Sequence, residues 1–132
     1  MAALVVDTSA LMAVLLQEPD AAVHAEALGA ASRLRMAAPV WLEAATVATG
    51  RSGEAGGREF ARFAEALDIE IIAADRALVE IAYEGWLRYG KGRHVAGLNY
   101  GDCFSYALAK LRQEPLLFKG NDFSLTDIAA GV

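Results

Sequence analysis

The chain has 132 residues, 55% of them hydrophobic and 22% charged, with a formal net charge of −5 at pH 7. This length predicts a single domain, residues 1–132, with enough apolar side chains to form a core. The negative charge excludes a protein that binds nucleic acid through its whole surface, because such proteins are usually basic, so any contact with nucleic acid must be local.

In chain order, the sequence predicts a strand at 3–7, helices at 8–17 and 18–31, a short strand at 33–38 and a helix at 39–51. A flexible glycine-rich turn is expected at 52–57, followed by a helix at 58–68, a strand at 69–75 and a helix at 76–90. The remainder predicts a loop at 90–102, a helix at 103–113, a strand at 115–120 and turns with a short apolar tail at 121–132. This alternation indicates an α/β protein with a largely parallel sheet between layers of helices.

The N-terminal residues and the cysteine content indicate the cellular setting. The start of the chain has no basic region, and the uncharged run 8–17 is too short to span a bilayer. The single cysteine, Cys103, cannot form an internal disulfide or a thiolate metal site alone. We therefore expect a cytoplasmic protein without a membrane segment, in which Cys103 is a small buried residue and not a nucleophile.

Isolated carboxylates are expected at one edge of the predicted sheet. Asp7 and Asp122 come just beyond strand ends, and Glu43 and Asp102 fall in the first turns of helices that start from the same edge. Each has an ordinary structural explanation, as a helix cap, an exposed helical residue or a turn residue. Ligands of parallel α/β proteins, however, bind at the carboxyl ends of the strands.

Convergence of these carboxylates would force protonation or recruit a cation, and a divalent metal is the natural solution. Two carboxylates about 5 Å apart repel each other by roughly 3 kcal/mol at an effective dielectric constant near 20. Oxygen ligands without paired His or Cys suit Mg²⁺ or Mn²⁺ better than Zn²⁺. Because a metal-bound water can attack a phosphodiester, this set of residues predicts hydrolysis of a nucleic-acid backbone.

Four segments resemble the motifs of PIN-domain ribonucleases of the VapC toxin type. They are VVDTSAL at 5–11, the helix around Glu43, LNYGDCFSYALAK at 98–110 and PLLFKGNDFSLTDI at 115–128. The resemblance covers nearly the whole chain and implies a three-layer α/β/α PIN-like fold with a mainly parallel central sheet. It also implies a Mg²⁺- or Mn²⁺-dependent endoribonuclease that acts on RNA, the toxin of a type II toxin–antitoxin pair, with a cognate VapB-like antitoxin and a homodimeric assembly.

The resemblance also assigns the site residues. The family's four acidic positions, expected to be catalytic and metal-binding, are matched by Asp7, Glu43, Asp102 and Asp122. Thr8 and Ser9 match the small hydroxyl residues after the first acid, which orient a ligand or a metal-bound water. Asn121 stands where some relatives have a second acid, so the negative charge of that corner is reduced. The expected reaction is direct hydrolysis that leaves a 5′-phosphate and a 3′-hydroxyl.

The loop before Asp102 is the densest basic stretch of the chain. Lys91, Arg93 and His94 are candidates to contact RNA phosphates at the rim of the acidic site, although a basic loop can also be simply solvated. Three large aromatic residues are expected in the core or in a dimer contact, rather than as platforms for base stacking: Trp41, Trp86 and Phe104.

Two other functions are compatible with the sequence. An aspartyl-phosphate phosphotransfer domain would use Asp7 as phosphoryl acceptor, but the D-x-D pair of such phosphatases is absent and the lysine of a receiver domain would have to be Lys119. A catalytically silent PIN-like module would bind a protein partner, which the presence of all four acidic positions disfavours. Trapping of a phosphoaspartate would favour the first, and metal-independent partner binding without nuclease activity the second.

Overall fold

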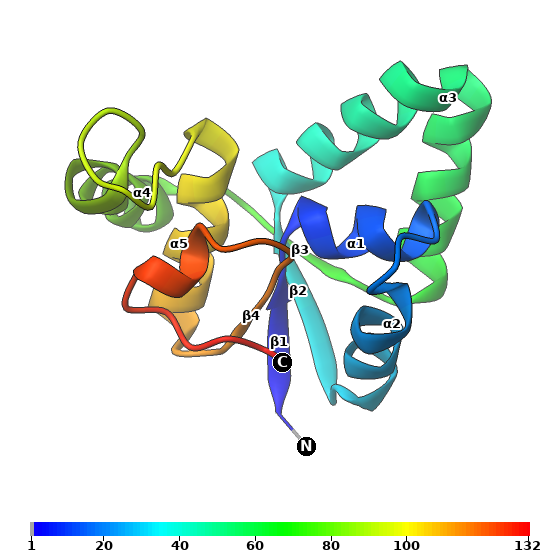
Figure 1. The fold of residues 1–132 in the computed structure, drawn as a ribbon, viewed down its shortest axis with the longest axis horizontal. Helices are drawn as coiled ribbons and strands as arrows, with labels where there is room; N and C mark the ends of the chain where they lie inside the picture. Colours follow the sequence, from blue (N-terminus) through cyan, green and yellow to red (C-terminus); the bar gives the residue numbers. More distant parts are fainter. Residues whose placement is uncertain (1) are drawn as a thin grey trace.

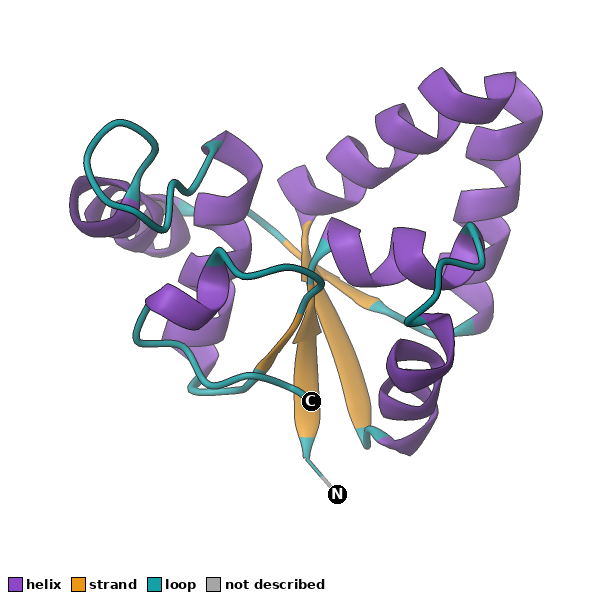
Figure 2. Ribbon diagram, in the orientation of Figure 1, coloured by secondary structure: helices purple, strands orange, loops and turns teal. Residues whose placement is uncertain are grey.

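The protein is built on a parallel sheet with helices on both sides (Figure 1, Figure 2). The computed structural model describes residues 2–132. The strands are β1 (Ala3–Val6), β2 (Arg33–Ala37), β3 (Glu70–Ile72) and β4 (Leu116–Leu117). The sheet has the order β3-β2-β1-β4, and all three pairings are parallel.

The helices form the two outer layers. They are α1 (Thr8–Leu15), α2 (Ala21–Ala30), α3 (Ala38–Ala66), α4 (Arg76–Tyr89) and α5 (Tyr100–Arg112), with a 3₁₀-helix, η1 (Phe123–Leu125). Figure 1 shows α4 and α5 on one side of the sheet and α1, α2 and α3 on the other. The predicted three-layer α/β/α architecture is therefore confirmed. None of these helices, in the part of the chain that the structure describes, is long and apolar enough to cross a membrane.

Apolar side chains fill the space between the layers. Val5 and Val6 of β1 are fully buried, as expected for an inner strand covered on both faces. Phe104 and Cys103 are also buried, and burial raises the pKa of the Cys103 thiol to about 11. The burial of the three large aromatic residues differs. Phe104 is buried in the core, and Trp41 is half-buried against Phe60. Trp86, in contrast, is 39% exposed and lies outside the core.

The prediction of a flexible turn at 52–57 is wrong. α3 continues through this stretch and is interrupted only by a kink, where Ser52 and Gly53 leave helical backbone angles. Gly53 has a φ of +71°, which glycine adopts without steric cost. Gly56 lies against the first arm of the helix, since a Cβ there would be 2.8 Å from the carbonyl oxygen of Ala48. The glycines thus allow two helical arms to meet at a close-packed bend, which is visible in Figure 1.

The ends of two other elements also differ from the sequence prediction. α5 begins at Tyr100, before the predicted start at residue 103, because Asn99 caps the helix. β4 ends at Leu117, so Asp122 does not follow a strand end directly but precedes η1 after a short loop. As a result, Asp102 lies inside α5 and not just before it, and Asp122 lies in a loop and not at a strand end.

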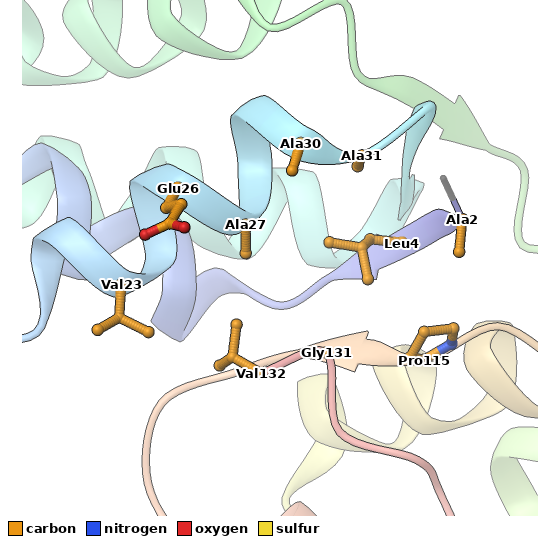
Figure 3. Close-up of a pocket in the computed structure, with 10 residues that line it drawn as sticks. All are labelled: Ala2, Leu4, Val23, Glu26, Ala27, Ala30, Ala31, Pro115, Gly131 and Val132. Carbon is orange, nitrogen blue, oxygen red and sulfur yellow. The ribbon is translucent and has the colours of Figure 1, made fainter.

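The two ends of the described chain lie together at the amino ends of the strands. A shallow, mainly apolar cavity of about 500 Å³ is present there, between α2 and the C-terminal residues (Figure 3). Its lining includes Ala2 and Leu4 at the start of β1, Val23 and Ala27 of α2, and Val132. The carboxyl ends of the strands, where the acidic residues were expected, form the opposite edge of the sheet.

Candidate active site

Asp7 follows β1 directly and is 4% exposed. Its Oδ2 accepts hydrogen bonds from the Ser9 backbone N–H at 3.1 Å and the Ser9 hydroxyl at 2.7 Å. Its Oδ1 accepts from the Ser105 hydroxyl at 2.6 Å. Asp7 therefore is the N-cap of α1, which is the structural role expected from the sequence. It is also a buried carboxylate, and these hydrogen bonds offset the cost of its desolvation.

Glu43 is half-buried and faces Asp7 from α3. It lies in the second turn of that helix, which begins at Ala38, and not in the first turn as predicted. Its Oε1 accepts a hydrogen bond from the Thr8 hydroxyl at 3.0 Å. Burial raises the pKa of Glu43, against the lowering effect of the Thr8 bond, and the negative charge of Asp7 raises it further.

Asp102 is half-buried in the first turn of α5. The side chain of Asn99 accepts from the Asp102 backbone N–H at 2.9 Å, and Asp102 Oδ2 accepts from the Asn99 backbone N–H at 3.0 Å. Asn99 is therefore the cap and Asp102 completes a capping box, a correction to the expectation that Asp102 itself starts the helix. Burial raises the pKa of Asp102 to about 7, against the lowering effect of the backbone bond. Three other negative charges add to this rise, those of Asp7, Asp122 and Glu43.

Asp122 and Asn121 lie at the exposed rim of this site, just before η1. Asp122 makes no side-chain cap bond to η1, so its carboxylate is not used by the helix that it precedes. The backbone oxygen of Asn121 accepts from the Ser124 hydroxyl at 2.6 Å. Asp122 thus contributes negative charge from the edge of the site, while Asn121 contributes to the local turn.

The other three carboxylates lie close enough to Asp102 for their charges to add to the rise of its pKa. Within residues 2–132, no group of three or more His, Cys, Asp or Glu side chains has an arrangement that could hold a metal ion. The hydrogen bonds to Ser9, Ser105, Thr8 and Asn99 direct several carboxylate oxygens toward protein donors. The donor chemistry, carboxylate oxygens without paired His or Cys, fits a hard divalent cation. Their assignment as catalytic and metal-binding residues stays a prediction.

The basic loop makes its own contacts on the α4 side of the protein. Lys91, Arg93 and His94 are all exposed. The Arg93 guanidinium lies over the Trp86 ring, 5.0 Å from its centroid. The Nδ1 atom of His94 accepts from the Ala96 backbone N–H at 3.0 Å. In the described chain none of the three side chains is hydrogen-bonded to an acidic site residue, so their role in RNA binding stays a prediction.

Two contributors to the site were not predicted. Ser105, which bonds to Asp7, lies three residues after Asp102 and therefore on the same face of α5. Gly101 lies against the Glu43 carboxylate, where a Cβ would be 2.3 Å from Oε2. The helical spacing of Ser105 from Asp102 is the one sequence signal that could have indicated its position.

Residues 4–129 match the family model of the PIN domain. The chain is 49% identical over 127 residues to a Ribonuclease VapC of Mycolicibacterium smegmatis, which covers 96% of this chain and 98% of the relative. It is 48% identical over 126 residues to Ribonuclease VapC30 of Mycobacterium tuberculosis, with 96% of each chain covered.

Two solved structures have the same fold. The crystal structure of Mycobacterium tuberculosis VapC20, a Sarcin-Ricin loop cleaving toxin, aligns with a TM-score of 0.78 at 18% identity over 96% of each chain. A toxin–antitoxin complex from Klebsiella pneumoniae aligns with a TM-score of 0.68 at 19% identity, covering 93% of this chain and 92% of the other. The resemblance seen in the sequence is confirmed by the family match and by the identities over almost the whole chain. The chain belongs to the PIN-domain family and, within it, to the VapC ribonucleases.

Proposed function

We propose that this protein is a Mg²⁺- or Mn²⁺-dependent endoribonuclease, the toxin of a type II toxin–antitoxin pair, which hydrolyses RNA phosphodiester bonds. Its family makes it an RNA-cleaving enzyme. The observation that carries the metal dependence is the gathering of four carboxylates at the carboxyl edge of the sheet, where Asp7 is buried and the other three charges add to the effect of burial in raising the pKa of Asp102. A divalent cation removes such repulsion and is the natural counterion of an oxygen-only site.

The side chains have different roles in the proposed reaction. Asp7 and Asp102 would bind the ion most directly. Glu43 and Asp122 would complete the set of carboxylates around it. When bound, the ion supplies Lewis acidity and a water of lowered pKa. Glu43 is suited to accept a proton, since its own pKa is raised and the Thr8 hydroxyl fixes one of its oxygens. Ser9 would keep Asp7 in place, as its two hydrogen bonds to that carboxylate indicate.

The test is cleavage of total cellular RNA by the purified protein with Mg²⁺, with Mn²⁺ and with EDTA. We expect discrete fragments in the presence of either metal and none in EDTA. The fragments should carry 5′-phosphate and 3′-hydroxyl ends, because direct hydrolysis forms a bond from water oxygen to phosphorus and releases the 3′-oxygen as a hydroxyl. Fragments with 2′,3′-cyclic phosphate ends would contradict this mechanism, since they require attack by the 2′-hydroxyl of the RNA.

We also propose that a VapB-like antitoxin binds this protein in the cytoplasm, where the RNA substrate lies. The Klebsiella pneumoniae protein of similar fold was solved as a toxin–antitoxin complex. An Arg or Lys of the antitoxin would pair with the site carboxylates and replace the metal charge, because charge-assisted hydrogen bonds to carboxylates are strong. A complex in which the acidic residues stay open to substrate would exclude this mode of inhibition.

We further propose a homodimer formed through the outer face of α4. Val79, Tyr83 and Trp86 are 45%, 61% and 39% exposed, and they line a groove of about 610 Å³ between α4 and α5. Exposed apolar patches of this kind mark contact surfaces. Tyr83→Ser is expected to convert a dimer into a monomer in light scattering at equal concentration. Val23→Ser, which alters another exposed apolar side chain, on α2, should leave the dimer intact, and an unchanged mass for Tyr83→Ser would place the dimer contact elsewhere.

The phosphotransfer alternative is not favoured by the geometry. A receiver-like lysine would have to act beside Asp7. The Lys119 ammonium instead pairs with Glu18 at 3.0 Å and with Asp20 at 3.3 Å. The Lys119 side chain thus forms ion pairs with the turn between α1 and α2.

A further inference from the structure

The carboxylate of Asp7 is held from two directions by serine hydroxyls. Ser9, two residues along the chain, bonds to Oδ2, and Ser105, which lies 98 residues away in sequence, bonds to Oδ1. Ser105 is 1% exposed and Asp7 is 4% exposed, so bulk water has little access to the bond between them. Each oxygen of Asp7 therefore accepts a short, charge-assisted hydrogen bond and keeps lone pairs for a further partner.

The direction of these bonds follows from the chemistry of the groups. An ionised carboxylate has no proton to donate, so the hydroxyl of Ser105 must be the donor. The hydroxyl of Ser9 is fixed in the same way, because its oxygen accepts from the Lys119 backbone N–H at 3.0 Å and its proton is directed to Asp7. Within the described chain, Asp7 Oδ1 is the sole hydrogen-bond partner of the Ser105 hydroxyl, which leaves it no competing local bond.

Ser105 also belongs to the helix that carries Asp102. The two residues are three positions apart on α5 and share one face of the helix. The first turn of the same helix lies against Glu43 through Gly101. The bond from Ser105 to Asp7 thus connects α5 to the end of β1 at the place where the acidic residues meet.

We propose that Ser105 is a positioning residue of the nuclease site, whose hydroxyl holds the Asp7 carboxylate in the orientation that binds the divalent cation and fixes it relative to Asp102. This role rests on the proposed metal-dependent function. Ser105 acts through Asp7 and does not itself touch the RNA. Loss of an outer hydrogen-bond partner of a metal ligand typically weakens metal binding or activity about 10- to 100-fold.

The experiment compares the full-length wild type with Ser105→Ala and with Ser32→Ala, which removes an exposed hydroxyl at the opposite edge of the sheet. Mn²⁺ affinity is measured by titration calorimetry, and kcat and KM are measured with a fluorescent RNA at saturating Mn²⁺. We expect Ser105→Ala to bind Mn²⁺ about tenfold more weakly and to lower kcat with little change in KM for RNA. Ser32→Ala should match the wild type in all three quantities.

A purely structural role for Ser105 would lower the melting temperature but leave Mn²⁺ affinity and kcat unchanged, and that result would overturn the proposal. If Ser105→Ala does not fold, Ser105→Cys decides the question, because its thiol is a weak donor of similar size and should also weaken Mn²⁺ binding. Wild-type affinity in a folded Ser105→Cys protein would then overturn the proposal. A wild type that neither binds Mn²⁺ nor cleaves RNA would overturn the proposed function itself, together with the role of Ser105.

Discussion

Asp102→Asn is expected to abolish RNA cleavage while making the metal-free protein more stable. Asparagine has almost the same shape, and its side-chain oxygen can still accept from the Asn99 backbone N–H that Asp102 now binds. The substitution removes one charge from a site in which burial and other carboxylates already raise the pKa of Asp102 to about 7. Cleavage should fall about 10³-fold or more, because under the proposed function Asp102 is a metal ligand and its loss removes several kcal/mol of transition-state stabilisation.

The stability gain should depend on pH in a defined direction. The pKa of Asp102 rises on folding, from an ordinary value of 3.8 to about 7. Protonation of Asp102 therefore stabilises the folded state, and this stabilisation is fully present below the ordinary pKa of 3.8. It is lost as the pH rises through about 7. In EDTA, the melting temperature of the wild type should decrease between about pH 5 and about pH 8, and Asp102→Asn should reduce that decrease. Each kcal/mol of repulsion removed raises the melting temperature by roughly 4 °C in a protein of this size.

Circular dichroism melts in EDTA at both pH values, together with RNA cleavage in Mn²⁺, check this prediction. Glu80→Gln is the matched control, because it removes one negative charge from an exposed position on α4 outside the site. It should leave cleavage and the pH dependence of melting unchanged. An Asp102→Asn protein that melts at a lower temperature than the wild type in EDTA at the higher pH would contradict the repulsion argument.

Gly101→Ala is expected to reduce cleavage about 10- to 100-fold without destabilising the protein, because small displacements of a catalytic group are costly in rate. A Cβ at this position would lie 2.3 Å from Glu43 Oε2 and 2.7 Å from Glu43 Cδ. The carboxylate is the end of a flexible side chain and can rotate away, which would break its bond to Thr8. Alanine meanwhile favours the helix by up to about 1 kcal/mol over glycine, which offsets the cost of moving Glu43.

Gly29→Ala provides the matched control for this prediction. Gly29 is also helical, in α2, and nothing lies within 4 Å of a Cβ built on it. Both variants should therefore melt at or above the wild-type temperature, and only Gly101→Ala should lose kcat/KM on RNA. Equal activity of the two variants would show that the position of the Glu43 carboxylate does not limit the reaction.

The layer architecture could be predicted from the sequence because the elements carry local signals. Apolar runs such as Leu4–Val6 are buried on both faces, and the helices alternate with them along the chain. The bend in α3 could not be predicted in the same way. Glycine-rich segments form either flexible turns or close-packed bends, and the choice depends on what packs against them, here Ala48 against Gly56. The capping box at Asn99 and Asp102, by contrast, was present in the sequence as a polar residue followed three positions later by an acid.

The sequence could predict which acidic residues, and which hydroxyl residues after Asp7, lie at the candidate site, while their catalytic roles stay a prediction. Parallel strands bring Asp7 and the helices that carry Glu43 and Asp102 to one edge, whatever the details of packing. The helical spacing of Ser105 from Asp102 indicates the face of α5 on which it lies, but its bond to Asp7 is a tertiary contact across 98 residues that no local pattern reveals. The contact of the Arg93 guanidinium with the Trp86 ring on α4 is likewise a tertiary contact without a local sequence signal, and the predicted contacts of the basic loop with RNA stay a prediction.

The position of the two chain ends has a practical consequence for measuring these reactions. Ala2 and Val132 both border the cavity at the amino ends of the strands, whereas Asp7 lies beyond the carboxyl end of β1 (Figure 3). A tag attached to either end therefore projects from the edge of the sheet opposite to the carboxylates. Protein tethered to a sensor surface through such a tag would keep its acidic edge facing the solution, so that Mn²⁺, RNA and antitoxin peptides can be tested on the same immobilised molecules.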